Sequence, residues 1–516
     1  MFLRSPGNVC EMSGSAAMVR RALTIALLLL SSCVLVACIS NSQSHTAPLS
    51  LDSAIEPSLS RRLQISPNTA RAENVILFVG DGMGVSTVTA SRIFDGQSLG
   101  QSGEEHVLSF EQFPHVALVK TYNTNQQVPD SAGSATALLT GTKTRAGVVG
   151  VGPAAERRNC SQSLIHKLQT IAELAEQRGL ATGMVTTARV THATPAAAYA
   201  HIPERDWESD RYISDADWAQ GCRDIAYQLA HFAVGDGLDV VFGGGRREFV
   251  NQSVGGERRR ADDLIDSWVN SASGRQFITS LEEIRSERTP TQVLGLFADS
   301  HMTYMAERRF DTDEPLLSEM TAAALDLLSQ SSDGFFLLVE GARIDHGHHE
   351  GRAGYALLEA QEFNHAIEVA LAKVDLAETL ILVTADHSNV LTIGGSPTRG
   401  NPILGLVHGN DLRGNPNVHP ELADDGMPYT TLGYQNGPGA VRHSARPAPA
   451  TGVHARQQAL YPLRGTLIDG SDDYYESHGG EDVALYAAGP WAHLVGGVLE
   501  QHVVFHIMTY AFGWDR

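Results

Sequence analysis

Residues 74–84 read NVILFVGDGMG, an apolar run that stops at an aspartate between two glycines. A short continuous run of Val, Ile, Leu and Phe is typical of a strand that is buried on both faces of a sheet. Asp81 then stands at the carboxyl end of the predicted strand. In an open parallel sheet, ligands bind beyond this end of the strands. The segment therefore predicts an α/β fold and indicates the edge at which a site would form.

The same arrangement recurs along the chain. Further apolar runs bounded by Gly or Asp stand at 184–187, 240–242, 335–339, 380–384 and 483–487. Helical patterns stand at 164–178, 318–329 and about 498–512. Strands that alternate with helices predict a large, mostly parallel central sheet with helices on both faces, a three-layer α/β/α architecture.

One long segment departs from this pattern. Residues 394–450 are dense in Gly and Pro and hold few apolar runs, which indicates an irregular inserted subdomain. We expect the α/β domain to cover residues 71–395 and 471–516, with the insertion at 396–470 between its two parts.

The first 37 residues have the pattern of an export signal. Two arginines precede an apolar run at 22–30, and two serines then interrupt the apolar character, so a secretory signal peptide is favoured over a membrane span. The segment ends in LVAC, which is similar to the bacterial lipobox, in which the cysteine is lipidated. We expect Cys38 to carry a lipid anchor; ordinary cleavage near Ala37 is the alternative. Translation can begin at Met1 or at Met18.

Residues 38–70 come after the predicted signal. They are rich in Ser, Pro, Asn and Gln, which predicts a tether, with a short helix near 57–63. Together with the signal, the tether predicts an exported protein, periplasmic or on the cell surface and anchored to the membrane by its N-terminus.

The net charge of the chain limits the classes of partner and substrate that it can bind. The formal net charge is −21, whereas nucleic-acid-binding proteins carry a basic footprint, so a nucleic acid is not expected as a specific partner. An anionic substrate would need local cations to approach so acidic a protein.

Once the signal and Cys38 are set aside, Cys160 and Cys222 remain. In an exported protein two cysteines favour a disulfide over two buried thiols.

Carboxylates and histidines follow three of the predicted strands. Asp81 follows the first, Glu340 begins EGARIDHGHH after the run at 335–339, and Asp386 and His387 follow the run at 380–384. Another set, ESHGGED, stands at 476–482. Carboxylates crowded at one sheet edge would repel one another, and divalent cations relieve that repulsion. Mixed Asp and His ligands suit Zn²⁺, and oxygen ligands alone suit Mg²⁺.

Spacing supports a metal centre. Asp345 and His349 are four residues apart, so on a helical turn both side chains face the same way. Asp386 and His387 are adjacent, and a turn beyond the strand end can bring both to one ion.

A nucleophile candidate stands in VPDSAGSATA, residues 128–137. Ser131 precedes small residues with helical propensity, and a helix N-terminus there would offer N–H groups and a positive dipole end to an anion. The alternative is that Ser131 or Asp130 is only a helix cap. No Gly-x-Ser-x-Gly motif surrounds Ser131, so activation by a metal is favoured over activation by a histidine.

These ordered motifs resemble the alkaline phosphatase family, and its animal-type branch most closely. The similarity extends from about Asn74 to the C-terminus and includes DGMG at 81–84, PDSA at 129–132, HATP at 192–195, residues 340–349, DHS at 386–388 and HGGED at 478–482. The resemblance implies hydrolysis of phosphate monoesters.

The resemblance also implies roles for individual residues. Ser131 would be the nucleophile that becomes phosphoserine, and Arg205 would clamp the phosphate. Two Zn²⁺ and one Mg²⁺ would be bound, the first zinc by Asp345, His349 and His478, the second by Asp81, Asp386 and His387, and the magnesium by Asp81, Thr194 and Glu340, with His192 behind the magnesium ligands. Cys160 and Cys222 match a disulfide of the animal-type enzymes, and residues 396–470 match a crown subdomain at a homodimer interface.

The chain departs from the animal-type pattern in two places. Those enzymes carry a calcium site, but here Ala298 follows Phe297 where that site uses a carboxylate; Glu314 can be retained from the site, and the sequence does not predict whether calcium is bound. The candidate anchor is N-terminal, whereas the animal enzymes have a C-terminal lipid signal. Two other functions stay open: a phosphodiesterase or sulfatase-like hydrolase with the same metal ligands, and a non-catalytic lipoprotein that binds metal or phosphate.

Overall fold

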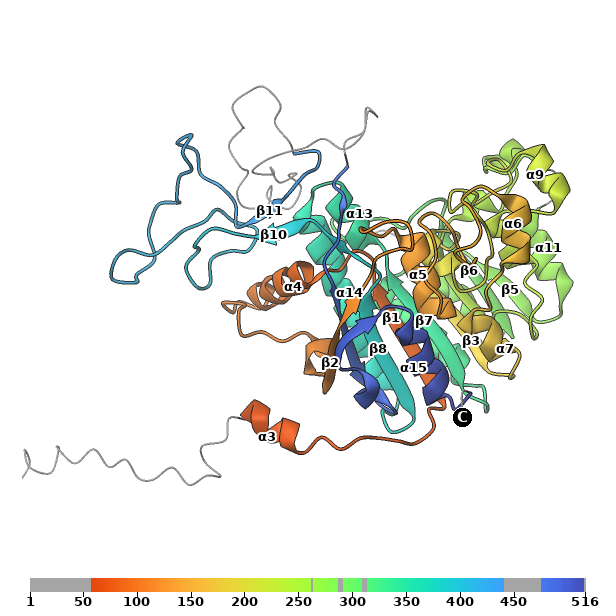
Figure 1. Ribbon diagram of the computed structural model, residues 1–516, viewed down its shortest axis with the longest axis horizontal. Helices are drawn as coiled ribbons and strands as arrows, with labels where there is room; N and C mark the ends of the chain where they lie inside the picture. The colour runs from red at the N-terminus through yellow and green to blue at the C-terminus, as the bar shows by residue number, and fades with distance from the viewer. Residues whose placement is uncertain (1–56, 261–262, 286–290, 309–312, 440–474, 515–516) are drawn as a thin grey trace, which may run out of the picture. The chain divides into compact units, whose positions relative to one another are not determined.

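The computed structural model describes residues 57–260, 263–285, 291–308, 313–439 and 475–514 (Figure 1). The chain divides into two units, Met1–Ile65 and Ser66–Arg516. In the first unit the described residues form one helix, α3 (Pro57–Leu63), as the sequence predicts. The predicted signal peptide and Cys38 lie outside the described residues. No helix in the described part of the chain has the length and apolar character that a membrane span requires.

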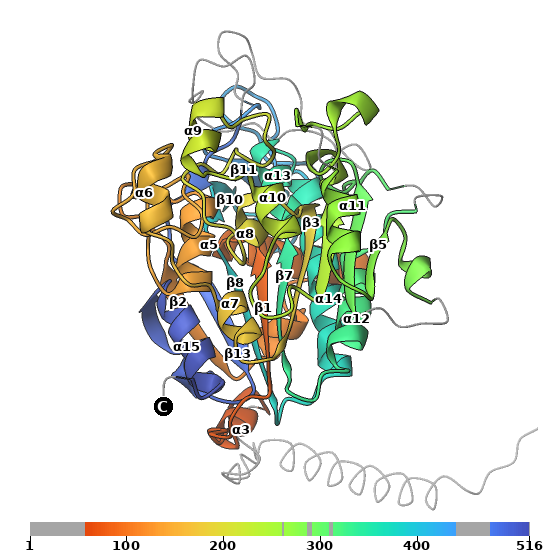
Figure 2. The same cartoon turned by 90° about the vertical axis from the view of Figure 1, so that its right-hand side faces the viewer.

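The second unit is built on a ten-stranded sheet in the order β14–β2–β13–β8–β1–β7–β3–β4–β6–β5 (Figures 1 and 2). Its strands are β1 (Asn74–Gly80), β2 (His115–Lys120), β3 (Ala181–Arg189), β4 (Val240–Gly244), β5 (Arg275–Ile278), β6 (Gln292–Ala298), β7 (Phe335–Gly341), β8 (Thr379–Ala385), β13 (Val483–Ala488) and β14 (Gly497–Glu500). Among these described strands, only β13 runs antiparallel to its neighbours, β2 and β8. The mostly parallel sheet predicted from the sequence is therefore confirmed.

Helices cover both faces of this sheet (Figures 1 and 2). One layer contains α4 (Val85–Ser98), α12 (Leu317–Leu328) and α14 (Ala353–Lys373), and the other contains α5 (Ser131–Thr140), α7 (Ile171–Glu176) and α15 (Val503–Ala511). The remaining helices are α6 (Cys160–Ile165), α8 (Ala193–Ala196), α9 (Asp215–Gln220), α10 (Ile225–Ala230), α11 (Leu264–Ser271) and α13 (Arg343–His349). The expected three-layer α/β/α architecture is thus observed.

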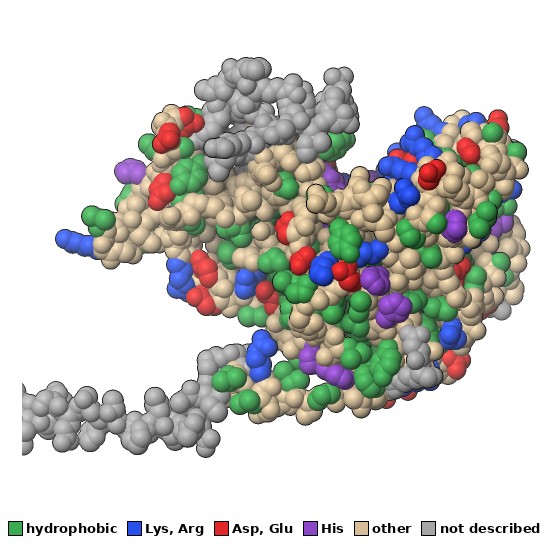
Figure 3. Space-filling model, in the orientation of Figure 1, with side chains coloured by type: hydrophobic (Ala, Val, Ile, Leu, Met, Phe, Trp, Pro, Cys, Tyr) green, Lys and Arg blue, Asp and Glu red, His purple; other side chains and the backbone are tan. Residues whose placement is uncertain are grey.

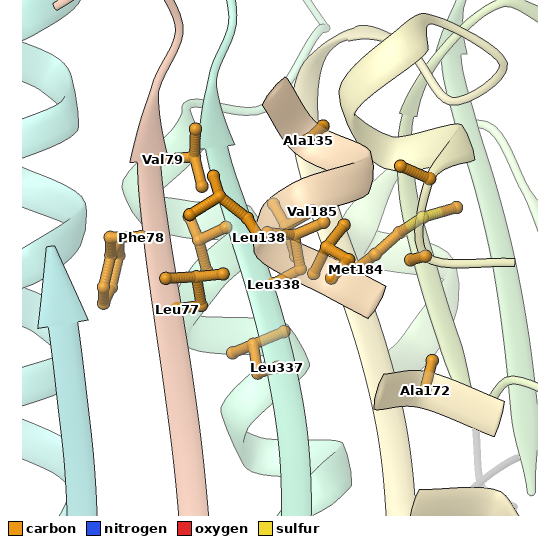
Figure 4. Close-up of a cluster of buried hydrophobic side chains, with 14 of the residues drawn as sticks. Leu77, Phe78, Val79, Ala135, Leu138, Ala172, Met184, Val185, Leu337 and Leu338 are labelled. Carbon is orange, nitrogen blue, oxygen red and sulfur yellow. The ribbon is translucent and has the colours of Figure 1, made fainter. Parts of the chain in front are cut away.

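The central strands are apolar because both faces are covered. Every residue of β7 and β8 is buried, as is every residue of β1 after Asn74. On one face, α5 lies over the strands, and its Ala135 and Leu138 belong to the same buried cluster as Leu338 and Val185 (Figure 4). Full burial of one such Leu or Val contributes roughly 1.5–3 kcal/mol relative to exposure. This packing holds rigidly the strand ends from which the site is built.

The predicted helix over 164–178 is wrong. The chain forms two short helices, α6 and α7, because residues 166–168 pair with residues 150–152 instead. The amide of Leu168 donates to the carbonyl of Gly150, and the amide of Gly152 donates to the carbonyl of His166. Thr170 and Glu173 then form a capping box that starts α7. This Thr-x-x-Glu signal is visible in the sequence and marks the true helix start.

The predicted helix over 498–512 is correct only in its second part. Residues 497–500 form β14, which pairs in parallel with β2, and α15 begins at Val503. Tertiary pairing therefore overrides a helical pattern at the sheet edge.

Four strands of the sheet have no counterpart among the apolar runs noted in the sequence. These strands are β2, β5, β6 and β14, and all four lie away from the central strands of the sheet. In β2 buried and exposed residues alternate, so its pattern is weaker than that of a strand buried on both faces.

The predicted disulfide is confirmed. Cys160, the first residue of α6, is bonded to Cys222, which lies two residues after α9. The bond ties α6 to the end of α9 across a sequence separation of 62 residues.

In the described part of the irregular segment, residues 394–431 lie between the two strands of a small sheet. Its strands β10 (Leu391–Ile393) and β11 (Leu432–Tyr434) are antiparallel, and we call residues 391–434 the β10–β11 insertion. Between the two strands the described chain forms turns and isolated bridges. The predicted insertion over 396–470 also includes residues 440–470, which lie outside the described residues.

Charged side chains of both signs lie close together on much of the face shown in Figure 3. Arg399 and Glu105 form one exposed pair of opposite sign (2.5 Å). The acidic excess is therefore not gathered into one uninterrupted field on that face.

Candidate active site

Three neighbouring strands deliver the predicted carboxylates to one edge of the sheet. β8, β1 and β7 are adjacent, and their last residues, Ala385, Gly80 and Gly341, are in register. The side chains that stand at these ends, Asp81, Glu340 and Asp386, are all fully buried. The prediction that these strand ends converge is confirmed.

A first cluster forms around α13. His349 Nε2 lies 3.1 Å from Asp345 Oδ2, since both side chains project from one side of the helix. His478 is the first residue of β12 (His478–Gly479), which pairs with β9 (Ser388–Asn389). Its Nε2 lies 3.1 Å from His349 Nε2 and 3.8 Å from Asp345 Oδ1. His349 thus contacts both Asp345 and His478, and ligand atoms of Asp345, His478 and His387 lie within 4.8 Å of one another.

A second cluster adjoins the first. Ligand atoms of Asp81, Asp386 and His387 lie within 4.8 Å of one another, and all three residues are buried. His387 Nε2 is 3.3 Å from Asp81 Oδ1 and 3.4 Å from Asp386 Oδ2. The His387 ring stacks on that of His478 with 3.6 Å between centroids. The turn after β8 therefore brings both adjacent residues, Asp386 and His387, to one point, as expected.

A third group shares Asp81 with the second. Ligand atoms of Asp81, His192 and Glu340 lie within 4.8 Å of one another. Thr194, the second residue of α8, is fully buried, and Thr186 donates a 2.5 Å hydrogen bond to Glu340 Oε2. His192 is the residue just before α8. Its ring is as close to the two carboxylates as a ligand would be, whereas the sequence placed it behind the magnesium ligands.

Ser131 is the first residue of α5 and is 2% exposed. Asp130 is the N-cap, accepting from the amide of Gly133, so the capping role belongs to Asp130 and leaves the Ser131 hydroxyl free for other contacts. Ser131 Oγ lies 3.0 Å from His387 Nε2 and 3.4 Å from Asp81 Oδ1. The serine therefore meets the second cluster at the positive end of a ten-residue helix.

Arg205 lies beside the helix N-terminus. Its Nη1 is 3.2 Å from Asp130 Oδ2 and its Nη2 is 3.1 Å from His192 Nε2. The amide of Arg205 also donates to the carbonyl of Gly147, whose own amide donates to Asp130 Oδ2. Asp130 thus holds the guanidinium, Gly147 and the start of α5 in one arrangement.

Burial raises the pKa of most of the clustered carboxylates and lowers that of most of the histidines. Against the effect of burial, the contact between Asp345 and His349 lowers the pKa of Asp345 well below its ordinary value and raises that of His349 to about 9. Burial, together with the nearby charge of Asp386, raises the pKa of Asp81 well above its ordinary value. Burial likewise raises the pKa of Asp386 to about 6 and that of Glu340 to about 8. Burial lowers the pKa of His387 to about 4 and that of His478 to about 3, which favours neutral rings, the form that binds metals.

Several buried atoms have no hydrogen-bond partner within the described structure. They include Asp81 Oδ2, Glu340 Oε1 and His192 Nδ1. Buried polar atoms are normally satisfied, so unpaired acceptors in a carboxylate cluster fit the binding of a cation. The donor set fits this, because histidine with carboxylate suits Zn²⁺ and the oxygen-rich third group suits Mg²⁺.

Sequence reasoning missed the residues that support these ligands. Asn389 donates to Asp345 Oδ1 (3.0 Å), Ser134 donates to Asp386 Oδ2 (3.2 Å), and Gln501 donates to the Asp386 carbonyl (2.6 Å). Asn389 and Ser134 each lie three residues from a predicted site residue, Asp386 and Ser131, which is a usable signal. Gln501 is 115 residues from its partner and gives no local signal.

Comparison with known proteins agrees with this geometry. A family model described as alkaline phosphatase matches residues 72–514. The human (Homo sapiens) tissue-nonspecific isozyme of alkaline phosphatase is 44% identical over 466 residues, covering 86% of this chain and 84% of that protein. An alkaline phosphatase of Gadus morhua is 42% identical over 466 residues, covering 86% of this chain and 92% of that protein.

Among solved structures, Thermus thermophilus alkaline phosphatase is similar with a TM-score of 0.61 and 25% identity, over 87% of this chain and 92% of that one. The match in fold therefore accompanies the match in sequence. Because the family model and the relatives both span nearly all of the second unit, the chain belongs to the alkaline phosphatase family.

Proposed function

We propose that this chain hydrolyses phosphate monoesters to an alcohol and inorganic phosphate through a phosphoserine at Ser131. One observation carries the proposal: the buried Ser131 hydroxyl lies at a helix N-terminus within 3.4 Å of Asp81 and 3.0 Å of His387, in a cluster of metal-type ligands. A binding protein would have no need for a nucleophile at that point.

Enzymes of this family depend on bound metal ions, and we assign two Zn²⁺ and one Mg²⁺ to this chain. The first zinc would be held by Asp345, His349 and His478, the second by Asp81, Asp386 and His387, and the magnesium by Asp81, Glu340 and Thr194, with His192 close enough to join them. When bound, these cations supply Lewis acidity that lowers the pKa of hydroxyl groups and offsets the charge of the phosphate.

The chain's own residues carry the two half-reactions. Ser131 Oγ loses its proton and attacks phosphorus, the ester P–O bond breaks, and the leaving alkoxide takes up one proton to become the alcohol. Water then attacks the phosphoserine, which releases inorganic phosphate and restores the hydroxyl. The helix α5 directs its N–H groups and positive dipole end at the developing charge.

Arg205 would bind the phosphate during both steps. Its planar guanidinium can donate to two phosphate oxygens at once, and its contact with Asp130 fixes the direction of the fork. These local cations overcome the repulsion expected from a chain with a net charge of −21.

Hydrolysis of p-nitrophenyl phosphate at alkaline pH, before and after chelation, tests the proposal. We expect activity to be lost on chelation and regained when Zn²⁺ and Mg²⁺ are added. A preference for bis-p-nitrophenyl phosphate would favour a phosphodiesterase instead. No phosphate release by folded, metal-loaded protein would favour a non-catalytic role.

Ser131→Ala removes the nucleophile and leaves the helix start intact. We expect its kcat/KM to fall by about a thousandfold or more, with unchanged zinc content, because nucleophilic catalysis is lost while binding groups remain. Undiminished activity in this variant would contradict the assignment of Ser131.

We also propose an exported homodimer held to the membrane by a lipid on Cys38. The support is the signal-like N-terminus with its lipobox-like end, and the similarity of residues 396–470 to the crown at a dimer interface. Cys38→Ala should move the protein from the membrane fraction to the soluble fraction, and sedimentation of the released protein should give twice the chain mass. Membrane association that persists in the variant, or a monomer, would contradict these two assignments.

A further inference from the structure

His348 stands out among the residues of α13 because the proposed mechanism does not use it. It lies between Asp345 and His349 on a helix of seven residues, and its side chain is fully buried. Its two ring nitrogens contact neither of those two side chains. They contact residues from other elements, one on each side of the ring.

Both contacts of the ring are hydrogen bonds to hydroxyl groups. Nδ1 lies 2.7 Å from the phenol oxygen of Tyr434, and Nε2 lies 3.0 Å from Thr87 Oγ1 in α4. In a neutral imidazole ring one nitrogen donates and the other accepts. A hydroxyl can take either role, so both nitrogens are satisfied.

Tyr434 belongs to the base of the β10–β11 insertion. It is the last residue of β11, is 2% exposed, and pairs with Leu391 of β10. Its ring packs in a small hydrophobic cluster that is separate from the main core. Phe94 of α4 and Leu357 of α14 contribute to the same cluster. The insertion is therefore fixed to the two helices that flank α13.

A second contact joins the residue just before the insertion to the same, C-terminal end of α13. The side chain of Glu476 accepts a 2.5 Å hydrogen bond from the amide of Val390, the residue just before β10. The carbonyl of Glu476 accepts from His349 Nδ1 (2.6 Å), and its amide donates to the His349 carbonyl (3.0 Å). β11 thus connects to α13 through His348, and the residue before β10 connects to it through Glu476.

We propose that the base of the β10–β11 insertion positions α13 through Tyr434 and His348, and so sets how firmly Asp345, His349 and His478 retain their cation. Tyr434 and His348 are positioning residues, since they act through α13 and do not touch the reacting atoms. This inference rests on the proposed function, in which these three ligands bind zinc.

The length of α13 explains why such support is needed. A helix of seven residues is far too short to be stable by itself, so tertiary contacts must fix its orientation. The cation would pull on Asp345 and His349 from one side of the helix. Tyr434 and Thr87 hold the helix from another side through His348. Groups that orient metal ligands typically change metal affinity or activity by about 10–100-fold when they are removed.

Tyr434→Phe tests the proposal, because it removes only the phenol oxygen from a buried ring. The rate of zinc loss from the holoenzyme is measured with an excess of chelator and a zinc-sensitive dye, alongside kcat and KM. We expect one zinc equivalent to leave about tenfold faster, the other to leave at the wild-type rate, and kcat to fall with KM nearly unchanged.

Tyr429→Phe is the matched control. Tyr429 lies in the same insertion and donates a 2.6 Å hydrogen bond to Glu421, which also belongs to the insertion and not to α13. This variant should lose both zinc equivalents at the wild-type rate. An equal acceleration in both Tyr variants would mean that loosening the insertion acts in general, and would overturn the specific role of Tyr434.

Two further outcomes are decisive. If Tyr434→Phe loses zinc at the wild-type rate, the proposal is wrong although the proposed function stands. If the wild-type holoenzyme releases no chelatable zinc, the proposed function fails first. Should Tyr434→Phe not fold, Thr87→Val removes the other hydrogen bond of His348; faster loss of one zinc equivalent upholds the role of the ring, and a wild-type rate overturns it.

Discussion

The carboxyl edge of the central sheet and the β10–β11 insertion are built in opposite ways. At the edge, Asp81, Glu340 and Asp386 stand at the ends of the buried strands β1, β7 and β8 and have no exposed surface. In the insertion, Leu412 is fully exposed and Val418 is 86% exposed. Between β10 and β11 only turns and isolated bridges are found in the described chain. The candidate ligands therefore lie in the well-packed region. In the described structure, the contacts between the insertion and the site come from the base of the insertion.

The same substitution in each region should give the largest contrast. Asp345→Asn keeps the shape of the side chain but removes the charge that would hold a cation, so we expect kcat to fall by about a hundredfold or more, along with zinc content. Asp411→Asn, an exposed carboxylate that accepts from the amides of Arg413 and Asn415, should leave kcat within about twofold. Kinetics and metal analysis of both variants check this; equal losses would remove the distinction between the regions.

Stability should divide along the same line. Leu337 is fully buried in β7, so Leu337→Ala should cost about 2–5 kcal/mol of unfolding free energy. Leu412→Ala, in the insertion, should change it by less than about 0.5 kcal/mol. Denaturant titration of both variants gives the two values. A large loss for Leu412→Ala would show that its side chain is covered in solution, by a partner copy for example.

The smallest expected effect is a change in the pH dependence of stability at Glu176, at the edge of the sheet opposite the candidate site. Burial, with the charge of Asp239 nearby, raises the pKa of Glu176 from 4.5 to about 8. The folded state therefore holds a proton that the unfolded chain releases at lower pH. The stability that this proton provides is present in full below pH 4.5 and is lost as pH rises through about 8.

Glu176→Gln should remove this loss, because the amide stays neutral and can still accept from Thr182. We expect the variant to exceed the wild type in unfolding free energy by about 1 kcal/mol at pH 9, with a smaller difference at pH 5. Asp239 and Asp236 face the same carboxyl group and contribute to its shift. Thermal melts at the two pH values decide the matter, and a pH-independent difference would contradict the titration of Glu176.

Much of the fold could be predicted because a strand that is buried on both faces consists of consecutive apolar residues, which are visible in the sequence. β1, β7 and β8 have this signal, and they are the strands that carry the site. β2 could not be predicted in the same way, since only alternate residues are buried. The helix predicted over 164–178 failed because pairing between residues 150–152 and 166–168 is tertiary and leaves no periodicity.

The candidate ligands of the site could be predicted for the same reason. The residues that hold these ligands in place could not. Asp81 and Asp386 follow strands directly, and Asp345 with His349 shows helical spacing. Tyr434 and Gln501 come from distant parts of the chain, and nothing near them in the sequence marks what they contact. The distance of Ser131 from the second cluster likewise depends on how α5 packs over the sheet.

The most direct test of the proposed chemistry is the identity of the reaction intermediate. Metal-loaded enzyme is quenched in acid during turnover of p-nitrophenyl phosphate, digested, and searched by mass spectrometry for a phosphorylated peptide. We predict one phosphoryl group on Ser131, which is absent from Ser131→Ala. Full activity with no phosphorylation of Ser131, or with the phosphoryl group on another residue, would contradict the proposed function.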